Sequence, residues 1–224
     1  IINSNSYGIA AAVQEAGGIP FLLGIARDTP EALKEKISHG LTADVLVLSG
    51  GVSMGDYDFT KAVFRELGAE MNFWKLAIRP GQPLAFGKIQ GKLAFGLPGN
   101  PVSSMVTFEQ LVRPAILKMN GHRSYGRPLV HAVIQEKFSK RTDRRHFLRG
   151  VLTREDGVFK VRTTGAQGSG ILTSMVKANC LIDIPVEVER VNPGDLVTVQ
   201  LLSGEAWKTQ AEHTHSTGHK TSCC

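Results

Sequence analysis

The sequence predicts an α/β domain with a mostly parallel sheet between two helix layers, followed by a small all-β, barrel-like domain. Strand and helix patterns alternate in the first half, which is typical of parallel sheets with helices on both faces. After residues 121–123, short alternating segments follow one another, separated by turn signals such as Asp156-Gly157. We therefore expect domains at residues 1–122 and 128–203, and a disordered tail at 204–224.

Four helices are predicted in the first half, because each helical pattern begins at a capping residue or proline and ends near a glycine. Thr29 and Pro30, for example, combine a cap with a proline at the first helical position. The predicted helices cover residues 3–16, 29–38, 60–67 and 100–119.

Strands are predicted from short apolar or alternating runs. Residues 44–48 form an apolar, β-branched run before Gly50 and Gly51, which is typical of a strand covered on both faces. Residues 19–25 also suit a buried strand, so Asp28 should lie at the same edge of the sheet. Residues 83–86 and 92–97 are predicted to form a strand pair that turns near Gln90 and Gly91. The other predicted strands cover residues 71–75, 130–138, 146–152, 159–162, 180–184 and 196–201.

The composition indicates a soluble globular protein. Of the 224 residues, 42% are hydrophobic and 21% are charged, which excludes wholesale disorder. No apolar run approaches the ~20 residues that a membrane helix needs. Three cysteines are too few for a disulfide framework or a zinc cluster, and Cys180 is predicted to be a buried strand residue. We expect a cytoplasmic protein without a membrane partner.

The net charge of +6 includes one dense basic cluster. A cluster of this kind can bind anions or form a solvated face. Because aromatic residues are sparse around it and no nucleic-acid module surrounds it, we expect no nucleic-acid partner. The cluster consists of Lys137, Lys140, Arg141, Arg144, Arg145 and Arg149.

Two glycine-rich loops are expected at the carboxyl ends of the strands, where ligands bind in doubly wound sheets. Residues 49–56 follow the predicted strand at 44–48, and their adjacent glycines let the backbone approach an anion, although a plain tight turn would also explain them. In residues 97–104, Asn100 can cap the following helix and Pro101 can begin it, which leaves a helix N-terminus suited to an oxyanion.

Charged residues between these loops are further candidates. Lys75 and Arg79 lead to a Pro-Gly pair and can bind an oxyanion or be surface cations. Asp28 and Asp58 suit Mg²⁺ held together with water and ligand oxygens, whereas Asp28 alone would be a turn or cap residue.

Three motifs in this order resemble the molybdopterin molybdotransferases, whose eukaryotic relative is the gephyrin E domain. They are Ser-Gly-Gly-Val-Ser-x-Gly at 49–55, Lys-x-x-x-Arg-Pro-Gly at 75–81 and Leu-Pro-Gly-Asn-Pro-Val-Ser at 97–103. The resemblance covers about residues 1–203. It implies a first domain of the molybdopterin-binding type, shared with molybdopterin adenylyltransferases, and the family's small C-terminal β domain.

The resemblance implies an enzyme that inserts molybdenum from molybdate into adenylylated molybdopterin and releases AMP, with Mg²⁺ assisting. It also implies a homodimer, and a molybdopterin adenylyltransferase could be a partner. The implied catalytic residues are Asp28, Asp58, Lys75 and Arg79, of which Asp28 and Asp58 also hold the metal. The family more often has Lys where Arg79 stands.

Other positions match the family's substrate-binding segments. Arg149 stands in Phe-Leu-Arg-Gly and Ser169 in Thr-Gly-x-Gln-Gly-Ser, and with Pro80 and Ser103 they are implied to bind molybdate or a neighbouring anion. The remaining implied substrate-binding residues are Gly50, Gly51, Ser53, Gly99, Asn100 and Pro101.

The family carries an earlier strand and a Thr-Gly-Asp-Glu segment before the position of Ile1, and two further N-terminal domains. We expect the chain to be part of a larger enzyme. The alternative is a molybdopterin-binding module, or an adenylyltransferase-like domain, without insertion activity.

Overall fold

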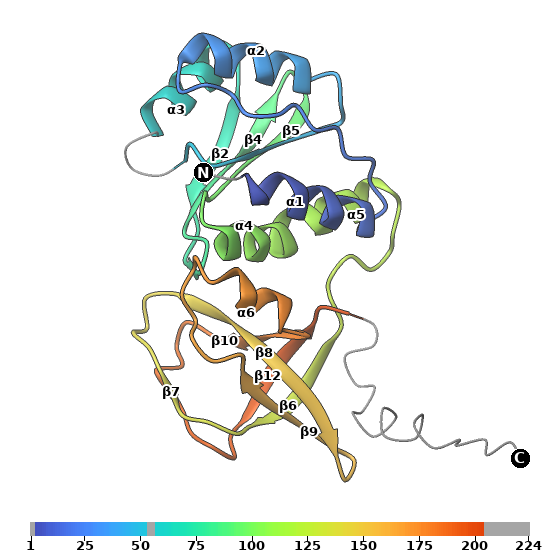
Figure 1. Cartoon of the computed structure of the whole chain (residues 1–224), viewed down its shortest axis with the longest axis vertical. Coiled ribbons are helices and arrows are strands. Elements are labelled where there is room, and N and C mark those ends of the chain that lie inside the picture. Colours follow the sequence, from blue (N-terminus) through green and yellow to red (C-terminus); the bar gives the residue numbers. More distant parts are fainter. Residues whose placement is uncertain (1–2, 53–56, 204–224) are drawn as a thin grey trace, which may run out of the picture.

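The computed structural model describes residues 3–52 and 57–203, without the side chains of residues 57–59. An α/β half is followed by a β-barrel half, as expected (Figure 1). The helices of the first half are α1 (Ser4–Glu15), α2 (Pro30–Gly40), α3 (Tyr57–Glu66), α4 (Pro101–Thr107) and α5 (Arg113–Met119), with a π-helical turn, η1 (Phe108–Val112), between the last two.

Local capping explains where the first helices begin. The Asn3 side chain accepts a hydrogen bond from the Ser6 amide at 3.2 Å, and the Thr29 hydroxyl accepts one from the Ala32 amide at 3.3 Å. These contacts satisfy amides that have no partner within the helix. Both predicted helix starts are confirmed.

The sheet of the α/β half is mixed rather than mostly parallel. Its strand order is β1 (Val45–Ser49), β5 (Lys92–Leu97), β4 (Pro83–Ile89) and β2 (Glu70–Lys75). Only β1 and β5 are parallel, and the other two pairs are antiparallel. The physical reason is the tight turn at Gln90 and Gly91, both at positive φ, which folds β4 back onto β5 as a hairpin.

Helices cover both faces of this sheet, as predicted (Figure 1). Successive side chains of a strand point to opposite faces. Phe95 therefore packs with α1, η1 and α5 on one face, whereas Ala94 packs with α2 and α3 on the other.

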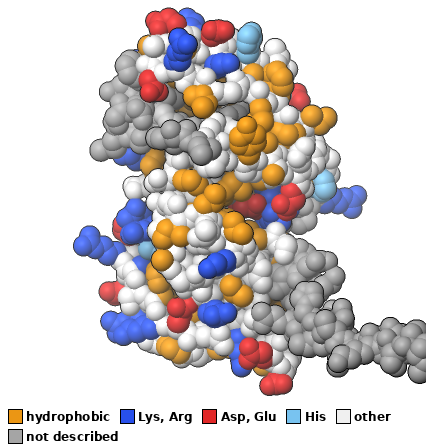
Figure 2. Space-filling view, in the orientation of Figure 1, with side chains coloured by type: hydrophobic (Ala, Val, Ile, Leu, Met, Phe, Trp, Pro, Cys, Tyr) orange, Lys and Arg blue, Asp and Glu red, His pale blue; other side chains and the backbone are white. Residues whose placement is uncertain are grey.

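The predicted strand at 19–25 is wrong. These residues have no regular secondary structure, and their large apolar side chains are exposed, as much as 96% for Ile19. Leu23 turns inward against Gly40, and its carbonyl accepts a hydrogen bond from the Lys36 ammonium at 2.7 Å. An apolar run predicts burial, but a strand also needs a hydrogen-bonding neighbour, and no described strand pairs with this segment. Figure 2 shows hydrophobic side chains gathered on this face of the α/β half.

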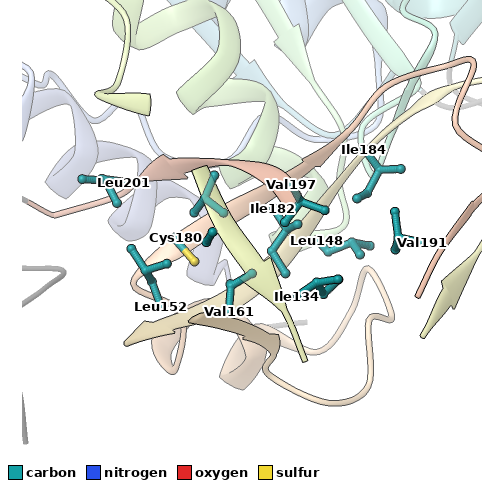
Figure 3. Packing of buried hydrophobic residues seen from close by; sticks show 12 residues of the cluster. Ile134, Leu148, Leu152, Val161, Cys180, Ile182, Ile184, Val191, Val197 and Leu201 are labelled. Carbon is teal, nitrogen blue, oxygen red and sulfur yellow. The ribbon is translucent and has the colours of Figure 1, made fainter. Parts of the chain in front are cut away.

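The second half is a closed barrel. It consists of β6 (Leu129–Ile134), β8 (Arg145–Glu155), β9 (Val158–Thr163), β10 (Cys180–Ile184) and β12 (Leu196–Leu201), closed by the pairing of β10 with β8. Figure 3 shows the apolar side chains that fill it, among them Cys180, which is fully buried as predicted. The predicted strand at 130–138 is two strands, because β6 ends at Ile134 and β7 (Phe138–Ser139) pairs instead with β11 (Arg190–Val191). The sequence patterns missed β11 and a short helix, α6 (Leu172–Val176).

The two halves share a sheet and a small core. A two-residue strand of the first half, β3 (Ile78–Arg79), pairs in parallel with the start of β8. Val102 and Val106 of α4 pack against Phe147 and Leu181 of the barrel. The residues that line the junction are therefore held by both halves. None of the helices in the described part of the chain has the length and apolar character that a membrane span requires.

Candidate functional site

A cavity of about 710 Å³ opens where the two halves meet. Five cationic side chains line it, against one carboxylate, that of Asp143. Figure 2 shows Lys and Arg side chains at the left of the molecule, around the junction of the halves. The cavity brings together five of the predicted site residues: Arg79, Pro80, Ser103, Arg149 and Ser169.

Arg149 is the most unusual of these residues because its large side chain is only 1% exposed. Its Nε donates to the Ser174 hydroxyl at 3.1 Å, and an Nη donates to the Gly168 carbonyl at 3.2 Å. No carboxylate among the described residues pairs with it, and burial lowers its pKa to about 10. It remains cationic at neutral pH. A buried, unpaired guanidinium beside a cavity is suited to bind an oxyanion.

Ser169 connects the barrel to the start of α4. Its carbonyl accepts a hydrogen bond from the Val102 amide at 3.1 Å, and its hydroxyl accepts one from the Asn100 side-chain amide at 3.2 Å. Asn100 precedes α4 as predicted, but its side chain makes no capping hydrogen bond. The expectation of a side-chain cap is therefore wrong, because that side chain reaches the other half instead. Ser103, in the first turn of α4, is buried at the cavity wall.

The segment from Arg79 to Gly81 is the part of the cavity lining that connects β3 to the α/β half. Arg79 lies in β3, where it is in register with His146 of β8. Gly81 has φ +109°, and a Cβ placed there would come within 2.4 Å of a Thr107 methyl carbon. Only glycine therefore lets this loop pack against α4 and hold Arg79 and Pro80 at the cavity.

Three further members of the basic cluster line the cavity: Lys140, Arg141 and Arg144. Lys140 is buried, and its ammonium donates to the Val186 carbonyl at 2.8 Å. Arg144 reaches across the junction to the Gln82 side chain at 2.9 Å. Lys140 is therefore not part of a merely solvated face, whereas Arg141 is exposed. Arg144 also pairs with Asp143 at 2.9 Å. Arg145 differs because its acidic partner, Asp183, is buried and neither residue lines the cavity.

The two glycine-rich loops lie side by side, because they follow the parallel neighbours β1 and β5. Gly50 and Gly51 both have positive φ, and a Cβ on Gly99 would lie 3.6 Å from the Gly50 Cα. The Asn5 side chain holds the loops together by donating to the Ser49 hydroxyl and the Gly99 carbonyl, both at 2.8 Å. Pro101 begins α4 directly after the second loop. The hydrogen bond between Asn100 and Ser169 connects these glycine-rich loops to the residues that line the cavity.

Other predicted residues are not brought to the cavity. Lys75 is exposed at the end of β2 and is not part of the cavity lining, and Asp28 is exposed in the bend before α2. Ser53 lies outside the described residues, as does the side chain of Asp58. No group of three His, Cys, Asp or Glu side chains gathers within the described ranges as a metal site.

Two lining residues were missed by sequence reasoning. The Gln167 side chain accepts a hydrogen bond from the Arg149 amide at 2.9 Å and donates to its carbonyl at 3.2 Å, so it fixes the backbone at Arg149. His146 lies three residues before Arg149 on β8. Gln167 belongs to the Thr-Gly-x-Gln-Gly-Ser motif, which could have indicated its role. No local signal marks His146, because its position at the cavity depends on the pairing of β3 with β8.

Comparisons with known proteins agree with this arrangement. Residues 1–118 match a family described as a probable molybdopterin-binding domain, and residues 131–202 match the MoeA C-terminal region, domain IV. A molybdopterin molybdenumtransferase of Haemophilus influenzae is 43% identical over 182 residues, which are 80% of this chain and 45% of the relative. One from Nostoc is 34% identical over 208 residues, covering 90% and 48%.

Among solved structures, a molybdopterin biosynthesis MoeA protein from Pyrococcus horikoshii is similar with a TM-score of 0.75 and 34% identity. The similarity covers 91% of this chain and 49% of that protein. The chain thus spans about half the length of the relatives it matches. By these matches it belongs to the family of molybdopterin-binding domains, here followed by the MoeA C-terminal region.

Proposed function

We propose that the chain carries the site for molybdenum insertion: it binds molybdate and adenylylated molybdopterin, and AMP is released as molybdenum enters the dithiolene. The observation that carries this proposal is Arg149, a buried guanidinium without an acidic partner in a cavity of mostly cationic lining. The relatives named molybdopterin molybdenumtransferase support it.

The residues have separate tasks in this proposal. Arg149, Arg79 and the hydroxyl groups of Ser103 and Ser169 bind the molybdate oxygens, with Pro80 shaping the wall. Charge-assisted hydrogen bonds orient the oxyanion, and the two-sided cavity wall limits its access to water.

The glycine loops would hold the rest of the substrate. The backbone at Gly50, Gly51 and Gly99 can approach its phosphate closely because no side chain intervenes. The Gly50 amide already donates to the Leu97 carbonyl at 3.0 Å, so the phosphate would be bound by the amides of Gly51 and Gly99. Asn100, Pro101 and Ser53 complete this group. Lys75 belongs to the proposal as a cation beside the substrate rather than in the cavity.

We also propose that Mg²⁺ accompanies the substrate, held by Asp28 and Asp58. The described residues do not assemble a metal centre by themselves, so most of its ligands would be water and phosphate oxygens. When bound, Mg²⁺ would neutralise charge on the phosphate. A cytoplasmic homodimer, a molybdopterin adenylyltransferase partner and domain ranges of 1–122 and 128–203 complete the proposal.

The test is AMP release from adenylylated molybdopterin, with and without molybdate, and with the Haemophilus influenzae relative as a positive control. We expect molybdate-dependent release by the chain and by Arg154→Met, whose residue is exposed at the far end of β8. Arg149→Met should abolish the dependence. Binding of the substrate without AMP release would contradict the proposal and favour a binding module.

A further inference from the structure

His146 is a buried histidine that lines the cavity and has no role in the proposed function so far. It lies near the start of β8, in register with Arg79 of β3 and with Ile184 of β10. The residue is only 6% exposed, and its ring meets the edge of the Phe138 ring with centroids 5.7 Å apart. It nevertheless lines the cavity that contains Arg149.

The imidazole has no hydrogen-bond partner within the described part of the chain. Neither ring nitrogen takes part in a hydrogen bond there. Among the described residues, the fully buried side-chain nitrogen without a partner is the Arg113 Nε, so both ring nitrogens of His146 keep some contact with solvent. A buried polar side chain normally has a partner. An imidazole at a cavity wall without one is therefore available to a ligand.

The charges around His146 keep it neutral. Burial, followed by the nearby cations of Lys140, Arg79 and Arg144, lowers its pKa to about 4, and Asp143 opposes this effect. On the β10 side its partner Ile184 is apolar. The Asp183 carboxylate next to it binds Arg145, and Arg149 is the remaining cation of the same cavity.

We propose that His146 is a proton-linked ligand of the bound oxyanion: it is neutral in the free protein, takes one proton from solvent when a tetrahedral dianion enters, and then donates a hydrogen bond to an anion oxygen. This inference rests on the proposed function, because it concerns the same cavity. The dianion brings two negative charges, and the imidazole gains one positive charge as a new N–H bond forms with a proton released by water or buffer acid. No bond of the anion is formed or broken.

The proposal fixes the direction of a pH effect. An anion beside the ring favours the imidazolium, so the pKa of His146 rises toward that of an ordinary histidine when the anion binds. Between the free and bound pKa values, binding takes up a proton, so affinity falls as pH rises, by at most about tenfold per pH unit. Above the bound pKa the affinity becomes independent of this group.

The test is calorimetric titration with sodium molybdate at pH 6.5, in buffers that differ in their enthalpy of ionisation. The dependence of the observed heat on the buffer gives the number of protons taken up. We expect a substantial fraction of one proton, and an affinity that falls several-fold from pH 6 to pH 8. Sulfate, which stays dianionic throughout this range, serves as a second probe.

Two variants assign the proton. His146→Gln keeps a polar side chain that cannot titrate, so proton uptake and the pH dependence should vanish while some affinity remains. His131→Gln removes an exposed histidine of β6 and should behave as the unchanged protein.

Each contrary result has a distinct meaning. Molybdate binding without proton uptake, or with equal uptake by His146→Gln, would overturn the role of His146 and leave the proposed function standing. The absence of molybdate binding would overturn both.

Discussion

Replacement of Arg149 by methionine separates the stability of the fold from binding of the anion. The guanidinium is 1% exposed and lacks an acidic partner among the described residues, and burial lowers its pKa from the ordinary guanidinium value to about 10. Each tenfold change in the acid constant corresponds to about 1.4 kcal/mol, so keeping Arg149 charged costs the native state on the order of 3 kcal/mol at pH 7. The effect is destabilising because, as pH rises, the folded state loses this proton at a lower pH than the unfolded chain does.

The variant also loses two hydrogen bonds, to Ser174 and to the Gly168 carbonyl, together worth about 2 kcal/mol. Ser174 keeps its own bond to the Ile171 carbonyl at 2.6 Å. Methionine fills similar apolar space, so the free energy of unfolding of Arg149→Met should be equal to that of the parent or about 1 kcal/mol higher. Its affinity for molybdate should fall about 100-fold, because a charge-assisted contact contributes about 2–3 kcal/mol.

The assay combines urea denaturation followed by circular dichroism with calorimetric titration of molybdate. Arg154→Met, on the same strand but exposed, is the control and should change neither quantity appreciably. A loss of several kcal/mol in Arg149→Met with unchanged molybdate affinity would refute the reasoning, since Arg149 would then be a structural residue.

Three further substitutions or treatments test other parts of the structure. Gly81→Ala should destabilise the fold by about 2–4 kcal/mol in urea denaturation, because φ is +109° and the new Cβ would meet a methyl group of α4 at 2.4 Å. The control, Gly126→Ala, has free space around its new methyl group and should be neutral, so equal effects of the two substitutions would contradict the packing. Arg127→Met should cost about 3 kcal/mol in the same assay, because it breaks the buried 2.8 Å pair with Glu109, and a neutral result would contradict that burial. Burial raises the pKa of Cys180 to about 12, so the native protein should resist alkylation of this thiol at pH 8 until urea is added; peptide mass mapping would reveal earlier labelling, which would argue against the barrel core.

Features with local causes could be predicted from the sequence. The caps at Asn3 and Thr29 act on amides within three residues, and the turn at Gln90 and Gly91 joins adjacent strands. Their physical causes lie within a few residues of the chain. These elements therefore lie close to where the patterns place them.

Features with distant causes could not be predicted in this way. Residues 19–25 have the composition of a strand, but the described sheet gives them no neighbour. The position of His146 depends on β3, a two-residue strand that no periodicity reveals. The prediction of Arg149 as a site residue rested on the resemblance to a family, because the sequence of a basic cluster does not show which of its members is buried.

The most direct test of the central claim is to locate molybdenum in a crystal soaked with sodium molybdate, by anomalous scattering near the molybdenum absorption edge. The account predicts one strong peak in the cavity between the halves, with oxygens within hydrogen-bond distance of Arg149, Ser103 and His146. A peak at another surface would contradict it, and so would a peak of undiminished occupancy in the same cavity of Arg149→Met at a molybdate concentration close to the dissociation constant of the parent.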